Sequence, residues 1–270
     1  AGAPIPYENI GQLTDSGFDM KLGYATNHTG FNWFADFVFS YYDNVINEMG
    51  EAQNGEELEH LNRTGNSVSA IYGYETDGYF ESESDIQSSP QQTFGTPRVG
   101  DLKYVDLNND NIIDSRDITV IGNYLGNMDM GMRLGFVWKN LDVETFIQGQ
   151  FNRDINLAGN PLAQPFIHGN AVNEITEEND FPTLTLSNMN NYQSSSYWVR
   201  NGDFVKVRNL EVGYSIPGKN LSRMNITQMR FFVRGVNVLT FSNWKYTDPE
   251  FTNIGYPPVK SYLLGVNVNF

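Results

Sequence analysis

The end of the chain, residues 260–270, alternates strictly between two kinds of side chain. The apolar phase holds Tyr262, Leu264, Val266, Val268 and Phe270, and the other phase holds Leu263, Gly265, Asn267 and Asn269. Side chains with a period of two predict a β-strand with one apolar face and one mostly polar face. A soluble protein must cover such an apolar face, whereas a transmembrane barrel leaves it against lipid. The pattern therefore favours a barrel strand.

Six other segments show the same alternation, so the sequence predicts seven strands. The regular segments are residues 18–25, 31–40, 130–139 and 141–148, and the less regular ones are Asp203–Ile216 and Gln228–Leu239. In Asp203–Ile216, Lys206 and Arg208 fall in the phase of Leu210 and Val212. We attribute this irregularity to a strand that projects beyond the bilayer.

The predicted connections alternate between short and long. The short ones are residues 25–30, 139–140 and 217–226, and the long ones are residues 41–129, 152–202 and 240–259. Bacterial outer-membrane barrels have short periplasmic turns and longer extracellular loops. The alternation therefore predicts three extracellular loops, with Phe270 at the periplasmic rim.

Seven strands are too few for a closed barrel. Bacterial single-chain barrels have an even number of strands, from eight upwards. An open edge in lipid would leave backbone N–H and C=O groups unpaired, at several kcal/mol each. We therefore expect residues 1–270 to be the C-terminal part of a larger barrel whose other strands lie outside this sequence.

Composition narrows the possible functions. The net charge of −15 argues against a nucleic-acid partner. No apolar run is long enough for a transmembrane helix, and hydropathy does not detect barrel strands. Aromatic residues reach 14%, and those that suit a girdle at the membrane interface are Tyr24, Trp33, Trp138 and Tyr214.

Residues 106–117, DLNNDNIIDSRD, have the spacing of a calcium-binding loop. An EF-hand loop places oxygen donors at positions 1, 3, 5, 7, 9 and 12 and a left-handed residue at position 6. The donors here would be Asp106, Asn108, Asp110, the backbone carbonyl of Ile112, Asp114 and Asp117. Position 6 is Asn111, and asparagine tolerates the left-handed conformation.

Two interpretations of this motif remain open. The first is a structural Ca²⁺ that neutralises the carboxylates and stiffens the long connection. The second is a cluster of Asx turns without a metal. In neither case does the motif imply a water-activating catalytic centre.

Aromatic residues in the long connections are candidates for contact with a ligand or a partner protein. They are Tyr79, Phe80, Trp198, Trp244 and Tyr246. The alternative is that these rings pack the connections onto themselves. We predict no catalytic residues, because the three histidines are far apart and lack HExxH or nucleophile motifs.

Successive blocks of the sequence resemble the SusC/RagA family. They include IYGYETDGYFESESDI at 71–86, VGDLKYVDLNNDNIIDSRDITVIGN at 99–123, YWVRNGDFVKVRNLEVGYSIP at 197–217 and the closing YPPVKSYLLGVNVNF. The resemblance covers nearly the whole chain in the family's order. Asn111 departs from the pattern, because the family often has glycine there, and this weakens the calcium assignment.

This resemblance implies a TonB-dependent outer-membrane transporter of Bacteroidota. Such proteins are plugged barrels of about 22 strands that import oligosaccharides or peptides. A SusD-like surface lipoprotein acts as the lid, and TonB acts through the plug. The plug and the remaining strands would lie outside this chain, which would supply barrel wall and loops embedded in outer-membrane lipid.

The alternative fold is a secreted, calcium-braced β-sandwich that binds glycans. The two folds differ in what lies against the apolar face. A sandwich covers Leu141, Val143 and Ile147 with a second sheet, whereas a barrel leaves them aligned and uncovered. A glycoside hydrolase would instead need two carboxylates converging in a cleft.

Overall fold

The computed structural model describes residues 11–51, 54–158, 182, 189–221, 225–244, 248–250 and 258–270. The chain divides into two compact units. The sheet unit comprises Gly17–Tyr42, Gly126–Arg153 and Asn201–Phe270, and the loop unit comprises Ala1–Ser16, Asp43–Leu125 and Asp154–Arg200.

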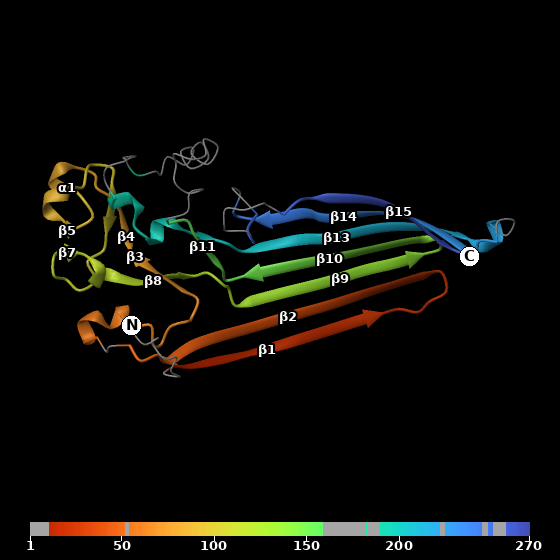
Figure 1. The fold of residues 1–270 in the computed structure, drawn as a ribbon, viewed down its shortest axis with the longest axis horizontal. Coiled ribbons are helices and arrows are strands. Elements are labelled where there is room, and N and C mark those ends of the chain that lie inside the picture. Colours follow the sequence, from red (N-terminus) through yellow and green to blue (C-terminus); the bar gives the residue numbers. More distant parts are fainter. Residues whose placement is uncertain are drawn as a thin grey trace, which may run out of the picture. The chain divides into compact units, whose positions relative to one another are not determined.

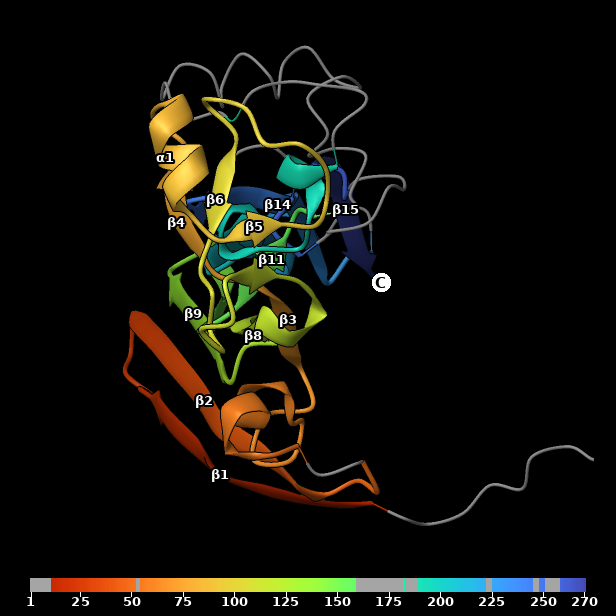
Figure 2. The ribbon, with the colours of Figure 1, turned by 90° about the vertical axis from the view of Figure 1, so that its left-hand side faces the viewer.

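One seven-stranded sheet dominates the fold (Figure 1). In spatial order its strands are β1 (Gln12–Ala25), β2 (Phe31–Glu48), β9 (Met128–Trp138), β10 (Leu141–Phe151), β13 (Phe204–Pro217), β14 (Gln228–Ser242) and β15 (Ser261–Asn269). Figure 2, viewed roughly along the strands, shows β1 in red and β15 in dark blue at the two ends of this order. The antiparallel pairs and the sequential order identify an up-and-down segment of a β-barrel wall.

The remaining elements are short and mostly belong to the loop unit. The strands are β3 (Ala70–Tyr74), β4 (Thr76–Tyr79), β5 (Gln91–Gln92), β6 (Leu102–Tyr104), β7 (Ile112–Ile113), β8 (Ile118–Asn123), β11 (Asp154–Asn156) and β12 (Val199–Asn201). The helices are η1 (Glu56–Leu61), α1 (Glu83–Ser88), η2 (Ser115–Asp117), η3 (Asn190–Tyr192), η4 (Ser196–Trp198) and, in the sheet unit, η5 (Gly218–Asn220). Among the described residues, no helix is long and apolar enough to cross a membrane.

The connections of the sheet alternate as the sequence predicts. Residues 26–30, 139–140 and 218–227 link neighbouring strands by short turns, and the other three connections are long. Because consecutive strands are antiparallel, all three long connections leave the same end of the sheet.

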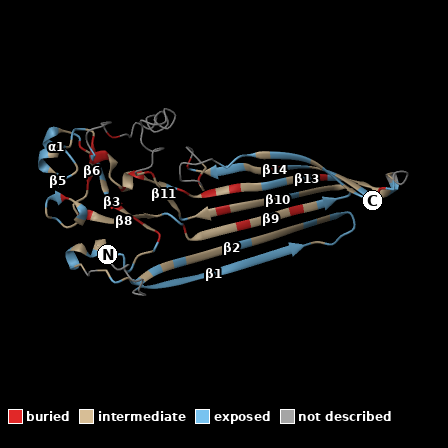
Figure 3. Ribbon diagram, in the orientation of Figure 1, coloured by how far each residue is buried: buried red, intermediate tan, exposed pale blue. Residues whose placement is uncertain are grey.

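One face of the sheet, called here the apolar face, is lined by rows of apolar side chains from neighbouring strands. One row runs through Phe31, Trp138, Leu141, Tyr214, Phe231 and Val266, and the next runs through Trp33, Phe136, Val143, Val212, Val233 and Leu264. Many of these side chains are uncovered, including Tyr214 (52% exposed) and Leu264 (84% exposed). Figure 3 shows β1 exposed along its length. A barrel wall leaves this face bare, whereas a sandwich covers it.

Strand β13 changes phase at a β-bulge. Opposite β10, Val207 pairs with Ile147 and Asn209 pairs with Phe146, so Arg208 is an extra residue. The register against β14 also shifts between Val207 and Asn209. A bulge moves the residues beyond it to the opposite phase. Lys206 therefore lies on the face opposite Leu210, and no projection of the strand beyond the bilayer is needed to explain the pattern.

Strand β2 runs eight residues beyond the predicted end at Ser40. The loop connection itself pairs with this extension. The Ile46 N–H donates to the Asn66 carbonyl (2.9 Å), and the Gly65 N–H donates to the Ile46 carbonyl (2.7 Å). The sequence signal weakens at 41–48 because polar residues interrupt the apolar phase.

The loop unit has a small core of its own. Tyr74, Leu102, Tyr104 and Ile113 form a buried cluster, and Tyr79 and Phe94 are among the residues that pack against it. Burial, with a smaller effect of the Asp114 and Asp117 carboxylates, raises the pKa of Tyr74 to about 12. This core holds β3, β6 and β7 of the loop unit together.

Candidate functional site

The face opposite the apolar face, called here the polar face, carries paired charges. On β9, Arg133 donates to both carboxylate oxygens of Glu144 on β10 (2.8 and 3.2 Å) and lies 3.8 Å from Asp36 on β2. Its guanidinium also lies 4.6 Å from the ring centroid of Phe34. Arg133 and Glu144 are about half exposed, as expected for a surface in contact with water.

A second set of ion pairs crosses strands β10, β13 and β14 on the polar face. Arg230 donates to Glu211 (2.7 Å) and to Asp142, and Arg234 donates to the other oxygen of Glu211. Glu211 lies directly opposite Glu144 in the strand register, so the two sets are neighbours. The sheet thus separates a hydrocarbon surface from a hydrated, charged one, as a transmembrane barrel wall does.

The motif at 106–117 folds as a series of Asx turns. Asp106 Oδ2 accepts from the Asn111 N–H (2.8 Å), and Asn108 Oδ1 accepts from the Asp110 N–H (3.1 Å). Asp110 Oδ1 then accepts from the Ile112 N–H (2.9 Å). Asn111 has φ 63°, so the predicted left-handed conformation at position 6 is confirmed.

The last two predicted donors close this loop. Asp114 and Asp117 form a reciprocal capping box around η2, in which the Asp114 N–H donates to Asp117 Oδ2 (2.9 Å). Asp117 is fully buried, and its other oxygen accepts from the Leu107 N–H (2.9 Å). Asp117 therefore fixes both ends of the motif.

Arg116 forms ion pairs with two carboxylates of this loop. Its guanidinium lies 2.6 Å from Asp110 and 2.9 Å from Asp114. Hydrogen bonds from Arg116 hold the pKa of Asp114 below its usual range. Over the described part of the chain, no group of three or more His, Cys, Asp or Glu side chains is arranged to hold a metal ion. The sequence motif did not reveal that Arg116 would supply a competing positive charge.

The predicted contact aromatics fall into different environments. Phe80 and Trp198 are buried in the loop unit, and Trp244 is buried in the sheet unit. Tyr79 is partly buried and packs against the core of the loop unit. Tyr246 lies outside the described residues. The buried rings pack within their units, and contact with a ligand or a partner protein stays a prediction for all five residues.

A buried polar network was not anticipated from the sequence. Asn191 on η3 accepts from the Leu102 N–H (2.8 Å) and donates to Asp101 (2.8 Å). Its neighbour Asn190 donates to the Leu102 carbonyl (2.9 Å) and accepts from Gln92 (2.5 Å). These bonds join segments about 90 residues apart in the sequence. They carry no periodic signal, so no pattern could have located them.

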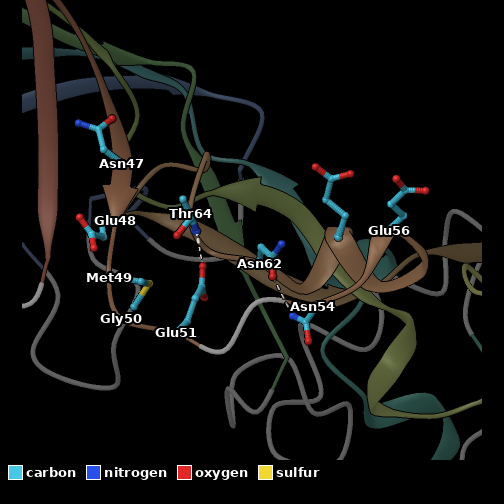
Figure 4. A pocket seen from close by; sticks show the side chains of 10 residues that line it. Asn47, Glu48, Met49, Gly50, Glu51, Asn54, Glu56, Asn62 and Thr64 are labelled. Atoms are coloured by element: carbon cyan, nitrogen blue, oxygen red, sulfur yellow. Dashed lines mark hydrogen bonds between the residues drawn. The ribbon is translucent and has the colours of Figure 1, made fainter.

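A polar cavity of about 710 Å³ lies beside the end of β2 in the loop unit (Figure 4). It is lined by Asn47, Glu48, Met49, Gly50, Glu51, Asn54, Glu56, Glu59, Asn62 and Thr64. Glu51 accepts from the Thr64 N–H (2.7 Å) and the Arg63 N–H (3.1 Å), and these bonds hold its pKa below the usual range. The lining offers carboxylate and amide oxygens to hydroxyl or amino groups.

No protein-family model matches the sequence. The chain is 25% identical to TonB-dependent receptor P3 of Formosa agariphila over its full length, which is 30% of that receptor. It is 22% identical to TonB-dependent receptor SusC of Bacteroides thetaiotaomicron, over 97% of the chain and 27% of the receptor. Over nearly its whole length the chain is similar to a segment of SusC/RagA-like TonB-dependent receptors. It spans about 30% of the length of the curated relatives that it matches.

Solved structures show the same fold for the segment. The structure of the RagAB peptide transporter matches 99% of this chain with a TM-score of 0.72 at 20% sequence identity, and the chain covers 31% of the matched protein. The open-open state of the RagAB peptide importer matches with a TM-score of 0.68. The related proteins are named as receptors and transporters, and none of them is named as an enzyme.

Proposed function

We propose that this segment supplies seven wall strands and three extracellular loops of an outer-membrane importer driven through TonB. The observation that carries the proposal is the uncovered apolar face, whose rows continue across the strands of the sheet. A surface of this kind is stable in lipid and unstable in water. The same observation disfavours the glycan-binding β-sandwich.

The two faces and two ends of the sheet then take defined roles. The apolar face contacts outer-membrane lipid, and the polar face with Arg133, Glu144 and Glu211 lines the lumen. The long connections lie outside the cell, and the short turns lie in the periplasm. A plug domain and the contact with TonB belong to parts of the receptor outside this segment.

The names of the relatives support a proposal for the substrate class and for the lid. SusC is named as a TonB-dependent receptor, and RagAB is named as a peptide transporter. We therefore propose that the receptor imports oligosaccharides or peptides and works with a SusD-like surface lipoprotein as its lid. The cavity lined by Glu51 and Asn54 offers hydrogen-bond acceptors that suit either class.

Uptake by intact cells tests the proposed function. Cells that depend on the parent receptor are given fluorescent oligosaccharide and peptide pools, with and without a protonophore. We expect one pool to enter, and uptake to stop when the proton gradient collapses, because TonB transmits that energy. Uptake that persists without the gradient would reject TonB-driven import, and the pool that enters identifies the substrate class.

The loop at 106–117 is proposed to hold a structural Ca²⁺. Its donors are hard oxygen ligands, which Ca²⁺ prefers. Asp106 Oδ1 is buried and has no hydrogen-bond partner in the described structure. The Arg116 guanidinium already neutralises Asp110 and Asp114, so a bound cation would have to displace it.

Calorimetric titration of the detergent-solubilised, chelator-treated receptor with Ca²⁺ tests this site. We expect a dissociation constant of about 10⁻⁴ to 10⁻³ M, as in extracellular calcium modules. Asp110→Asn should weaken binding, and Arg116→Gln should strengthen it by removing the competing charge. Identical heats for the unsubstituted receptor and both variants would show that the loop is an Asx-turn cluster without a metal.

A further inference from the structure

A buried lysine binds the β14–β15 connection in the sheet unit. Lys206 on β13 is only 1% exposed, and its Nζ donates to Glu250 Oε2 (2.6 Å) and to Asp248 Oδ1. Arg208 forms a second ion pair with Glu250 and also donates to Gln148 (3.0 Å). A buried charge is stable only when it is paired and hydrogen-bonded, and Lys206 has both carboxylates as partners.

The segment 248–250 is also held by contacts other than these ion pairs. Arg153 donates to the backbone carbonyl of Pro249, and the Glu250 N–H donates to Asp248 Oδ1 (3.0 Å). Pro249 is among the most completely buried residues of the protein. These three residues are therefore fixed against the sheet although they belong to a connection between strands.

The bulge at Arg208 determines which face of the sheet receives this segment. Lys206 lies opposite Gln148 in the register with β10, and Gln148 is in phase with Glu144. Lys206 and Arg208 therefore contact 248–250 on the polar face. Without the extra residue, Lys206 would fall in the apolar phase of Leu210, where its charge would face hydrocarbon.

We propose that Lys206 is a positioning residue that clamps residues 248–250 onto the polar face and thereby narrows the passage along it. The narrowing rests on the proposed function, since it matters only if the polar face lines the lumen. The clamp itself does not, because it depends only on contacts within the sheet unit. Lys206 thus limits the size of solute that passes this part of the wall.

Replacing Pro249 by cysteine provides a direct report on the clamp. Residues 1–270 contain no cysteine. Pro249→Cys, in a receptor whose other cysteines have been replaced, therefore gives a single thiol for maleimide labelling. We expect this thiol to be protected. Adding Lys206→Met should speed labelling about tenfold or more, because a change of about 1.4 kcal/mol in the opening equilibrium already gives a factor of ten. Lys139 lies exposed in the turn between β9 and β10 and provides the control. Lys139→Met removes the same charge and should leave the thiol protected.

Two further variants separate charge pairing from packing. Glu250→Gln keeps the Lys206–Asp248 pair and should give an intermediate rate of labelling. This milder variant tests the clamp even if the Lys206→Met receptor fails to fold. Exchanging the charges with Lys206→Glu and Asp248→Lys restores the pair between positions 206 and 248 but places a carboxylate beside Glu250, so it should restore part of the protection. Fast labelling in the Pro249→Cys receptor with Lys206 intact, or full protection after both Lys206→Met and Glu250→Gln, would overturn the clamp.

Uptake measurements test the narrowing. In cells, Lys206→Met should raise the uptake ratio of long to short oligomers, and Lys139→Met should not. Faster labelling with an unchanged ratio would leave a clamp that does not limit passage and would overturn that half of the proposal. Absence of all uptake by the unsubstituted receptor would instead contradict the proposed function and leave the labelling result intact.

Discussion

Replacing Leu264 by arginine is expected to destabilise the receptor far more than the same replacement at the adjacent Leu263. Leu264 lies on the apolar face and is 84% exposed, whereas Leu263 lies on the polar face opposite Arg234. An arginine facing lipid costs about 2–4 kcal/mol at the bilayer midplane and less near the interfaces. Leu264 lies one row away from Tyr214 and Phe231, which are close to the short turns. We therefore expect Leu264→Arg to lower the free energy of unfolding by about 2 kcal/mol.

The control differs only in the direction of the side chain. An arginine at position 263 would point into a hydrated face and meet one like charge, which costs less than about 1 kcal/mol. Urea unfolding of the receptor in lipid vesicles, followed by tryptophan fluorescence, measures both values. Equal losses at the two positions would mean that the sheet does not separate lipid from water.

The second large effect is expected at Asn191 in the loop unit. Asn191→Leu removes the acceptor of the Leu102 N–H and the donor to Asp101, and all three residues are buried. The Leu102 N–H loses its acceptor, and Asp101 loses one of its donors while it keeps the Arg98 N–H. A buried polar group left without a partner costs about 1–3 kcal/mol, so we expect the loop unit to lose about 2 kcal/mol of local stability.

Hydrogen exchange of the intact receptor measures this loss where it occurs. Amides of β6 should exchange faster in Asn191→Leu by the factor that corresponds to the lost free energy. Gln193→Leu is the matched control, because Gln193 makes one exposed bond to the Met189 carbonyl (3.0 Å), and its effect should stay within about 0.5 kcal/mol. Unchanged exchange at β6 in Asn191→Leu would show that the network does not hold the loop unit together.

The strands of the sheet could be predicted from the sequence because one side chain in two must face hydrocarbon. That constraint produces the alternation in residues 130–138 and 141–148, and the structure pairs these segments in register. The explanation predicted for the irregular phase at Lys206 and Arg208 was wrong. A single inserted residue reverses the phase there, and the composition of the strand does not indicate such an insertion. The carboxylates that pair with Lys206, those of Asp248 and Glu250, are distant in the sequence and meet it only in the folded structure.

The loop unit was much less predictable. Its stability comes from contacts between residues distant in sequence, such as Asn190 with Leu102 and Tyr104. The motif at 106–117 is the exception, because an Asx turn forms between near neighbours and the spacing of the donors is visible in one segment. Its conformation at Asn111 was predicted correctly, whereas the pairing of Arg116 with Asp110 was not.

The central claim is that one face of this sheet contacts lipid and the other contacts water. A nitroxide scan along β10, from Leu141 to Phe151, in the receptor reconstituted in liposomes tests it most directly. We predict that odd positions such as Val143 and Ile147 collide with lipid-soluble oxygen, and that even positions such as Glu144 and Gln148 collide with a water-soluble nickel complex. Loss of this alternation, with odd and even positions equally accessible to the nickel complex, would contradict the account.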